Sequence, residues 1–192
     1  MSSAAAAASP WLLRWAHLIA TGGSVLDVAA GSGRHARWLA GHGFAGTAID
    51  RDAAAMQALA GCAETIVADI EGDPWPLDGR SFDAVLVTNY LWRPLLPAIV
   101  ATTGPGGVLL YETFAAGNES VGRPARPDFL LAPGELLGAV AGLRIVAYED
   151  GFLDDPDRFV QRIVAVRERN TGAPARHPLA GAGPGPARMP GR

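Results

Sequence analysis

Short apolar runs alternate along this chain with stretches in which apolar residues recur every three or four positions. Runs of roughly four to eight apolar residues are typical of strands buried in a sheet, and the longer period is typical of helices that cover it. The pattern predicts strands over residues 24–29, 45–50, 64–69, 82–88 and 107–113. It predicts helices over residues 10–20, 33–42, 52–60, 94–102 and 133–141. Because strands and helices alternate, we expect the strands to lie parallel in one sheet.

The last two apolar runs, residues 143–149 and 159–166, are separated by the loop 150–158 and by no helix. Parallel neighbours need a crossover of about a dozen residues or more, so these two runs predict an antiparallel hairpin. Together the elements predict an α/β fold. It is a doubly wound, mostly parallel sheet of seven strands that ends in a C-terminal antiparallel hairpin.

Length and composition predict the domain organisation. The 192 residues, 49% of them hydrophobic, suffice for one domain with a buried core. We expect that domain over residues 10–167, after a flexible leader at 1–9 and before a disordered tail at 168–192 that is rich in Gly, Pro and Ala. The single cysteine, Cys62, excludes an internal disulfide and a thiolate-cluster metal site. With no apolar run long enough to span a membrane, the sequence predicts a cytoplasmic protein.

Charge excludes some classes of function. The predicted domain and its leader hold 12 arginines against 18 acidic residues, whereas the tail holds 4 arginines against one glutamate. An acidic body is a poor partner for nucleic acid, so none is expected. All sixteen basic residues are arginine. Without lysine the chain has neither a Schiff-base amine nor the Gly-Lys pair of a P-loop nucleotidase.

The most informative motif follows the first predicted strand. Its apolar run, residues 25–29, stops at Gly31-Ser32-Gly33, and an amphipathic helix begins directly afterwards. Glycines at a turn from strand to helix permit positive φ and close approach of a ligand to the backbone. The helix start also presents free N–H groups to an anionic group. The motif therefore predicts a site for a nucleotide-like ligand.

The turn by itself fits two kinds of nucleotide site. Gly31, Gly33 and Ala36 match a dinucleotide fingerprint, with Asp50 about twenty residues further on as the ribose-binding acid. However, Asp27 stands inside the strand, where that fingerprint normally has an apolar residue. Asp69 and Ile70 end a third apolar run. This succession, followed by the runs 82–89 and 104–111, resembles the class I S-adenosylmethionine (SAM)-dependent methyltransferases over residues 10–167.

The resemblance implies a Rossmann-like fold, SAM as cofactor and S-adenosylhomocysteine as product. It implies that Asp50 binds the ribose hydroxyls, and that Asp69 and Ile70 face the adenine. Ionised carboxylates suit this task because they accept several charge-assisted hydrogen bonds. Near the methionyl part, it places Ala29, Gly31 and Gly33 along the chain, Asp27 at the ammonium group and Arg34 at the carboxylate, with Arg14 a weaker candidate.

The resemblance also implies where the methyl acceptor binds. Asn89 and Tyr90, after the fourth strand, lie where methyltransferases place residues beside the transferred methyl. Asn89 is therefore also a cofactor candidate, and Tyr90, Asn89 and Glu112 are the catalytic candidates; His35 is a further possible base. The stretch 115–131 is long enough to form a lid. The chain looks like a small bacterial group distantly similar to tellurite-resistance-type and thiopurine-type methyltransferases.

For partners, we expect a small-molecule methyl acceptor, no metal, no membrane, and a monomer or homodimer. Structural readings of single residues stay open. Asp50 or Asp52 caps the following helix, Asp69 ends its strand in a turn with Gly72, Asp27 orients the glycine turn, and Arg34 and His35 are ordinary helix residues. Two other functions also stay open: an NAD(P)-binding Rossmann oxidoreductase or dinucleotide sensor, and a non-catalytic SAM-binding protein.

Overall fold

The computed structural model describes residues 7–172 and 175–180. Seven strands form one sheet, and their bounds are β1 Ser24–Val28, β2 Ala45–Asp50, β3 Glu64–Val67, β4 Phe82–Thr88, β5 Thr103–Phe114, β6 Arg144–Asp154 and β7 Asp157–Val166. Their order across the sheet is β3-β2-β1-β4-β5-β7-β6. Strands β1 to β5 pair in parallel, while β7 runs antiparallel to both β5 and β6. The predicted fold class is confirmed.

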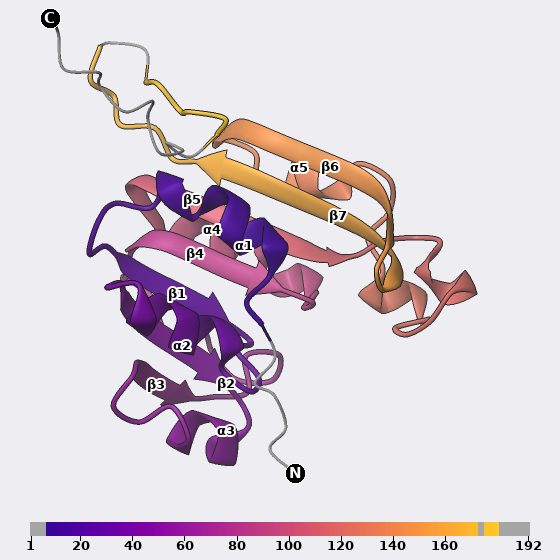
Figure 1. Cartoon of the computed structure of the whole chain (residues 1–192), viewed down its shortest axis with the longest axis horizontal. Helices are drawn as coiled ribbons and strands as arrows, with labels where there is room; N and C mark the ends of the chain where they lie inside the picture. Colours follow the sequence, from indigo (N-terminus) through magenta and orange to yellow (C-terminus); the bar gives the residue numbers. More distant parts are fainter. Residues whose placement is uncertain (1–6, 173–174, 181–192) are drawn as a thin grey trace, which may run out of the picture.

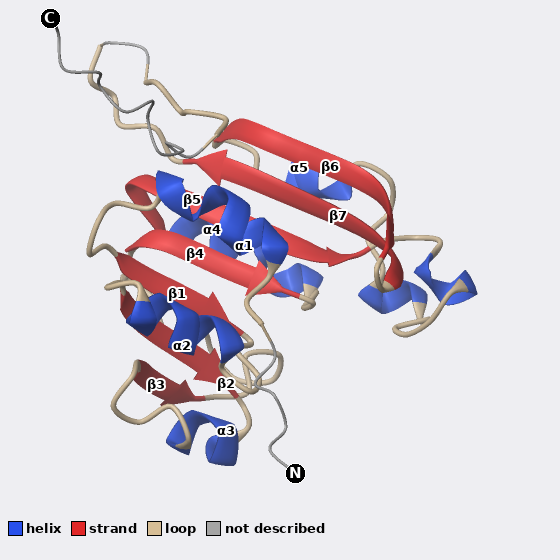
Figure 2. Ribbon diagram, viewed as in Figure 1, coloured by secondary structure: helices blue, strands red, loops and turns tan. Residues whose placement is uncertain are grey.

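Helices cover both faces of the sheet (Figures 1 and 2). They are α1 Pro10–Trp15, α2 Arg34–Gly41, α3 Ala53–Gln57, α4 Leu96–Thr102 and α5 Glu135–Ala139, with four 3-10 turns, η1 Ala16–Leu18, η2 Arg93–Leu95, η3 Asn118–Ser120 and η4 Pro127–Phe129. Alternating strand residues divide the core in two. Val25 and Leu86 pack with α1 and α2, whereas Leu26 and Val85 pack with α4 and α5. The sheet is therefore buried on both faces, as its continuous apolar runs predict.

Several predicted boundaries differ from the structure. The first helix ends at Trp15 rather than at residue 20, with η1 following. The helix predicted over 52–60 becomes α3 and hydrogen-bonded turns, and the fifth strand begins at Thr103 rather than at residue 107. The predicted loop 150–158 is wrong, because β6 and β7 continue to a turn at Asp155-Pro156. Many side chains of β6 are exposed at this edge of the sheet, so no apolar run marks its extension.

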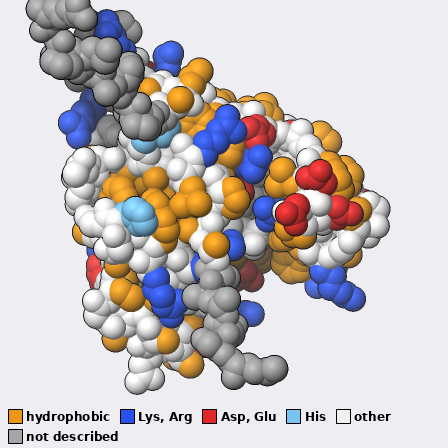
Figure 3. Space-filling view, in the orientation of Figure 1, with side chains coloured by type: hydrophobic (Ala, Val, Ile, Leu, Met, Phe, Trp, Pro, Cys, Tyr) orange, Lys and Arg blue, Asp and Glu red, His pale blue; other side chains and the backbone are white. Residues whose placement is uncertain are grey.

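The hairpin places acidic side chains at one edge of the sheet. Since β6 and β5 point the same way, the β6–β7 turn lies at the edge where the parallel strands end. Asp154, Asp155 and Asp157 are exposed around this turn. Acidic side chains gather there in the space-filling view (Figure 3). The carboxyl edge of the sheet is therefore negative beside β5.

Parts of the predicted leader and tail, residues 1–6, 173–174 and 181–192, lie outside the described residues. Within the described ranges, no helix is long and apolar enough to cross a membrane.

Candidate functional site

The sheet reverses its strand order between β1 and β4. In open parallel sheets, ligands bind beyond the carboxyl ends of the strands at this reversal. The turn from β1 to α2 lies there. Ala29, Gly31 and Gly33 all adopt positive φ, at 54°, 53° and 75°. The Gly33 N–H donates to the Ala30 carbonyl over 2.9 Å, which closes the turn directly before α2.

The two glycines of this turn have different surroundings. A Cβ on Gly33 would lie 2.4 Å from the Leu59 side chain, whereas a Cβ on Gly31 would meet nothing within 4 Å. Gly33 thus lets α2 pack closely against the segment after α3. Gly31 leaves open space beside the backbone, as a bound ligand requires.

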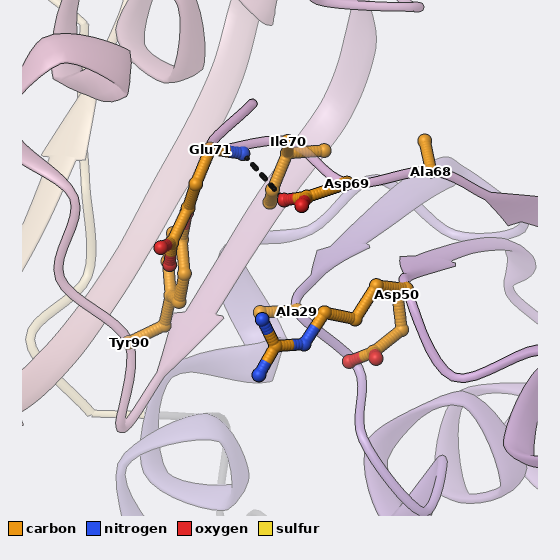
Figure 4. Close-up of a pocket in the computed structure, with 8 residues that line it drawn as sticks. Ala29, Asp50, Ala68, Asp69, Ile70, Glu71 and Tyr90 are labelled. Atoms are coloured by element: carbon orange, nitrogen blue, oxygen red, sulfur yellow. Dashed lines mark hydrogen bonds between the residues drawn. The ribbon is translucent and has the colours of Figure 1, made fainter. Parts of the chain in front are cut away.

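A cavity of about 280 Å³ lies at the ends of the strands β1 to β4. Its volume is near the lower end of small-molecule sites. Figure 4 shows side chains from all four strand ends around it. The lining residues are Ala29, Asp50, Arg51, Ala68, Asp69, Ile70, Glu71 and Tyr90. Five residues predicted from the sequence, far apart in the chain, therefore meet in one cavity: Ala29, Asp50, Asp69, Ile70 and Tyr90.

Asp50 is held firmly at this cavity. Its Oδ2 accepts the Gly31 N–H over 2.8 Å, and its Oδ1 accepts the Asp52 N–H over 2.9 Å. A carboxylate has about four acceptor positions, so two remain for a ligand. The capping role belongs to Asp52, whose Oδ1 accepts the N–H groups of Ala54 and Ala55.

Asp69 both ends its strand in a turn and faces the cavity. Its Oδ1 accepts the Glu71 N–H over 3.1 Å, and its carbonyl accepts the N–H groups of Gly72 and Asp73. The turn with Gly72 is thus present, and the hydrogen bond from the Glu71 N–H orients the carboxylate at the cavity wall. Ile70 is 8% exposed and packs in the core while also lining the cavity.

Asp27 is a buried acid without a hydrogen bond. It is 1% exposed, and neither carboxylate oxygen has a hydrogen-bond partner among the described residues. The Nδ1 of His35, also buried, lies 3.7 Å from Asp27 Oδ1. Burial of an ionised carboxylate is unfavourable unless a cation or donors satisfy it. Asp27 therefore has capacity for a donor such as an ammonium group.

Asn89 and Tyr90 stand at the end of β4. Asn89 has φ 56°, and its N–H donates to the Glu112 carbonyl over 3.0 Å. Burial raises the pKa of the Tyr90 hydroxyl above its ordinary value, and the carboxylates of Glu71 and Asp69 raise it further. The phenol therefore stays protonated at neutral pH. The raised pKa favours a phenol that donates a hydrogen bond in this site.

A second cavity, also about 280 Å³, adjoins the first and shares Glu71 and Tyr90 with it. It is completed by residues that follow β4 and β5 and by the stretch 115–131, namely Asn89, Leu91, Thr113, Phe114, Pro124 and Phe129. Tyr90 and Glu71 thus form a wall between two neighbouring cavities.

Comparisons with known proteins agree with this arrangement. A sequence model described as a methyltransferase domain matches residues 25–107, from β1 to the start of β5. The matched segment covers less than half of the chain. No curated protein sequence matches it significantly.

Solved structures show the same fold. TehB from Haemophilus influenzae superposes with a TM-score of 0.63 at 21% identity, over 79% of this chain and 60% of TehB. A SAM-dependent methyltransferase from Methanosarcina mazei superposes with a TM-score of 0.64 at 15% identity, over 85% of this chain and 99% of that protein. The [4+2]-cyclase SpnF superposes with a TM-score of 0.61 at 17% identity, over 82% of this chain and 78% of SpnF. This chain thus spans less than two thirds of TehB.

Several residues predicted from the sequence line neither cavity, namely Arg14, Asp27, Gly31, Gly33, Arg34, His35 and Glu112. Glu112 is 2% exposed, accepts a hydrogen bond from the Ser9 hydroxyl at the start of α1, and lines neither cavity. Arg34 donates to the Ala7 carbonyl over 3.3 Å. Arg14 pairs with Glu149 of β6 at 2.7 Å. Glu112 and Arg14 thus each have a side-chain partner within the fold.

Three lining residues were not predicted: Arg51, Ala68 and Glu71. Each stands within two positions of a predicted acid, Asp50 or Asp69. The same argument from strand ends, applied to the residues flanking each acid, would have found them.

Proposed function

We propose that this protein is a SAM-dependent methyltransferase that acts on a small molecule. The observation that carries the proposal is the position of the Asp50 carboxylate. It is held by the glycine turn at the mouth of a cavity that Asp69 and Ile70 also line. SAM supplies a methyl group on a sulfonium, a good leaving group, so the protein chiefly has to bind, align and exclude water.

The residues of the first cavity fit the adenosyl part of SAM. Asp50 retains two acceptor positions for the vicinal ribose hydroxyls. Asp69 and Ile70 would hold the adenine, with Ile70 offering an apolar surface to the ring.

The residues around the glycine turn fit the methionyl part. The open space at Gly31 would admit it, with Ala29 and Gly33 shaping the turn. The unpartnered carboxylate of Asp27 would receive the ammonium, directly or through water. Arg34, whose present partner is a single carbonyl, would bind the carboxylate.

The second cavity is the proposed acceptor site, with stretch 115–131 as its lid. Phe129 and Pro124 of this stretch line the cavity. Arg93, before α4, fastens the stretch by donating to the carbonyls of Asp128 and Leu130, each over 2.8 Å. Its guanidinium also forms a two-point pair with Glu135. A closed lid would keep water away from the sulfonium and hold a nucleophile in line with the methyl.

Two measurements test the proposal. By calorimetry, we expect S-adenosylhomocysteine to bind the full chain at micromolar concentration and NADH to give no response. The reverse would favour a dinucleotide-binding protein. Labelled SAM incubated with a metabolite extract should then yield a methylated small molecule. Tight binding without any transfer would instead favour a SAM-binding protein that does not transfer methyl groups.

A further inference from the structure

The charge on the wall of the second cavity is negative. Of the described residues that line it, Glu71 is the one charged side chain. Figure 4 shows the Glu71 side chain lying along Tyr90 at the wall between the two cavities. Arg51, whose charge also acts on Tyr90, lines the first cavity and not the second.

Two further observations indicate negative potential here. Burial raises the Tyr90 pKa most, and the charges of Glu71 and Asp69 raise it further, against a lowering by Arg51. The exposed aspartates of the β6–β7 turn lie at the same edge of the sheet. A cationic molecule would be attracted to this edge, whereas a carboxylate or phosphate would be repelled.

The other walls are aromatic and apolar. Tyr90, Phe114 and Phe129 line the cavity together with Leu91 and Pro124. A cation already rests on one of these rings, because the Arg126 guanidinium carbon lies 5.3 Å from the centre of Phe129. Aromatic faces attract ammonium groups in this way, more strongly where water is excluded.

We propose that the acceptor is an amine with a small apolar body, bound in the second cavity with its ammonium group at Glu71. This inference rests on the proposed function. The ammonium gives one proton to the Glu71 carboxylate or to solvent, which frees the nitrogen lone pair. The nitrogen then forms a bond to the methyl carbon while the carbon–sulfur bond breaks, with its electron pair passing to sulfur. The products are a methylated ammonium and neutral S-adenosylhomocysteine.

The test uses two probes of one shape and opposite charge, 2-phenylethylamine and 3-phenylpropionate, on the full chain loaded with S-adenosylhomocysteine. We expect the amine to bind at least tenfold more tightly by calorimetry, and to accept labelled methyl when SAM replaces the product. Glu71→Gln should remove most of this preference. Asp78→Asn removes another exposed negative charge, one that lines neither of these two cavities, and should leave the preference unchanged.

Equal or tighter binding of the carboxylate, identical behaviour of the two variants, or no binding of the amine would each overturn the inference. Binding of S-adenosylhomocysteine alone is measured first. If it fails, the proposed function is wrong. If it succeeds and the amine fails, only the acceptor class is wrong.

Discussion

The backbone N–H of Gly31 donates to Asp50 Oδ2 over 2.8 Å, and thereby joins the glycine turn after β1 to the acid that ends β2. The turn and the acid are nineteen residues apart, and the parallel pairing of β1 with β2 places them side by side. The bond fixes the carboxylate in one orientation without using all of its acceptor positions. A ligand's hydroxyls would thus meet a carboxylate that is already ordered.

Asp50→Ala tests this carboxylate. We expect binding of S-adenosylhomocysteine to weaken by about 1.5–3 kcal/mol, because hydrogen bonds to a charged group are lost. Calorimetric titration measures the change. Asp52→Ala is the control, since it removes the cap of α3 and costs about 1 kcal/mol of stability but touches neither cavity. Unchanged affinity in Asp50→Ala would remove that residue from the site.

The two glycines of the turn should respond oppositely to alanine. Gly33→Ala places a Cβ 2.4 Å from Leu59 at positive φ, so we expect it to lower the free energy of unfolding by about 2–5 kcal/mol. Gly31→Ala meets no neighbour and should cost only about 1–2 kcal/mol. Its main effect should be weaker binding of S-adenosylhomocysteine. Thermal unfolding and calorimetry together distinguish them, and equal loss of stability would contradict this division of roles.

Arg93→Ala should loosen the stretch 115–131. Pairing with Glu135 raises the pKa of Arg93 and lowers that of Glu135, as expected for an ion pair. The pair is partly exposed, since the Arg93 side chain is 40% exposed. We therefore expect the free energy of local opening of this stretch to fall by only about 1–2 kcal/mol. Chymotrypsin should then cleave after Phe129 roughly five to thirty times faster. Arg80→Ala, which breaks a surface pair elsewhere, serves as the control, and equal cleavage of both variants would refute the fastening role.

The pair between Arg80 and Glu64 should make stability depend on pH. A hydrogen bond from the Arg80 guanidinium lowers the Glu64 pKa from 4.5 to about 2. A lowered pKa in the folded state stabilises the protein above the ordinary value, and this contribution is lost as pH falls from about 4.5 towards 2. Both side chains are about half exposed, so Glu64→Gln should cost only about 0.2–1 kcal/mol at pH 7.

Urea unfolding of wild type and Glu64→Gln at pH 7 and pH 3 checks this dependence. The difference between the two proteins should shrink at the lower pH. Asp78→Asn controls for the loss of one negative charge. A difference that grows towards acid pH would contradict the assignment.

Part of the site could be predicted because the end of an apolar run in the sequence marks the end of a strand. Asp50 and Asp69 each close an apolar run, and parallel strands bring their carboxyl ends to one edge. The sequence did not predict which side chains are buried or which face of a strand each side chain lies on. Glu112 also lies near the end of a strand, yet the two-residue alternation of β5 turns its side chain towards α1 and Ser9. Which face of a strand borders a cavity depends on the helices packed there.

The amino-acid sequence by itself determined the order of strands and helices, the glycine turn and the acids that follow it, because these depend on local periodicity and on backbone conformation. Only the tertiary structure decided that Gly33 packs against Leu59 while Gly31 stays open, and that burial and Glu71 raise the pKa of Tyr90. These properties arise from distances and burial between segments far apart in the chain. No local pattern encodes such distances, because they are set when the helices pack on the sheet.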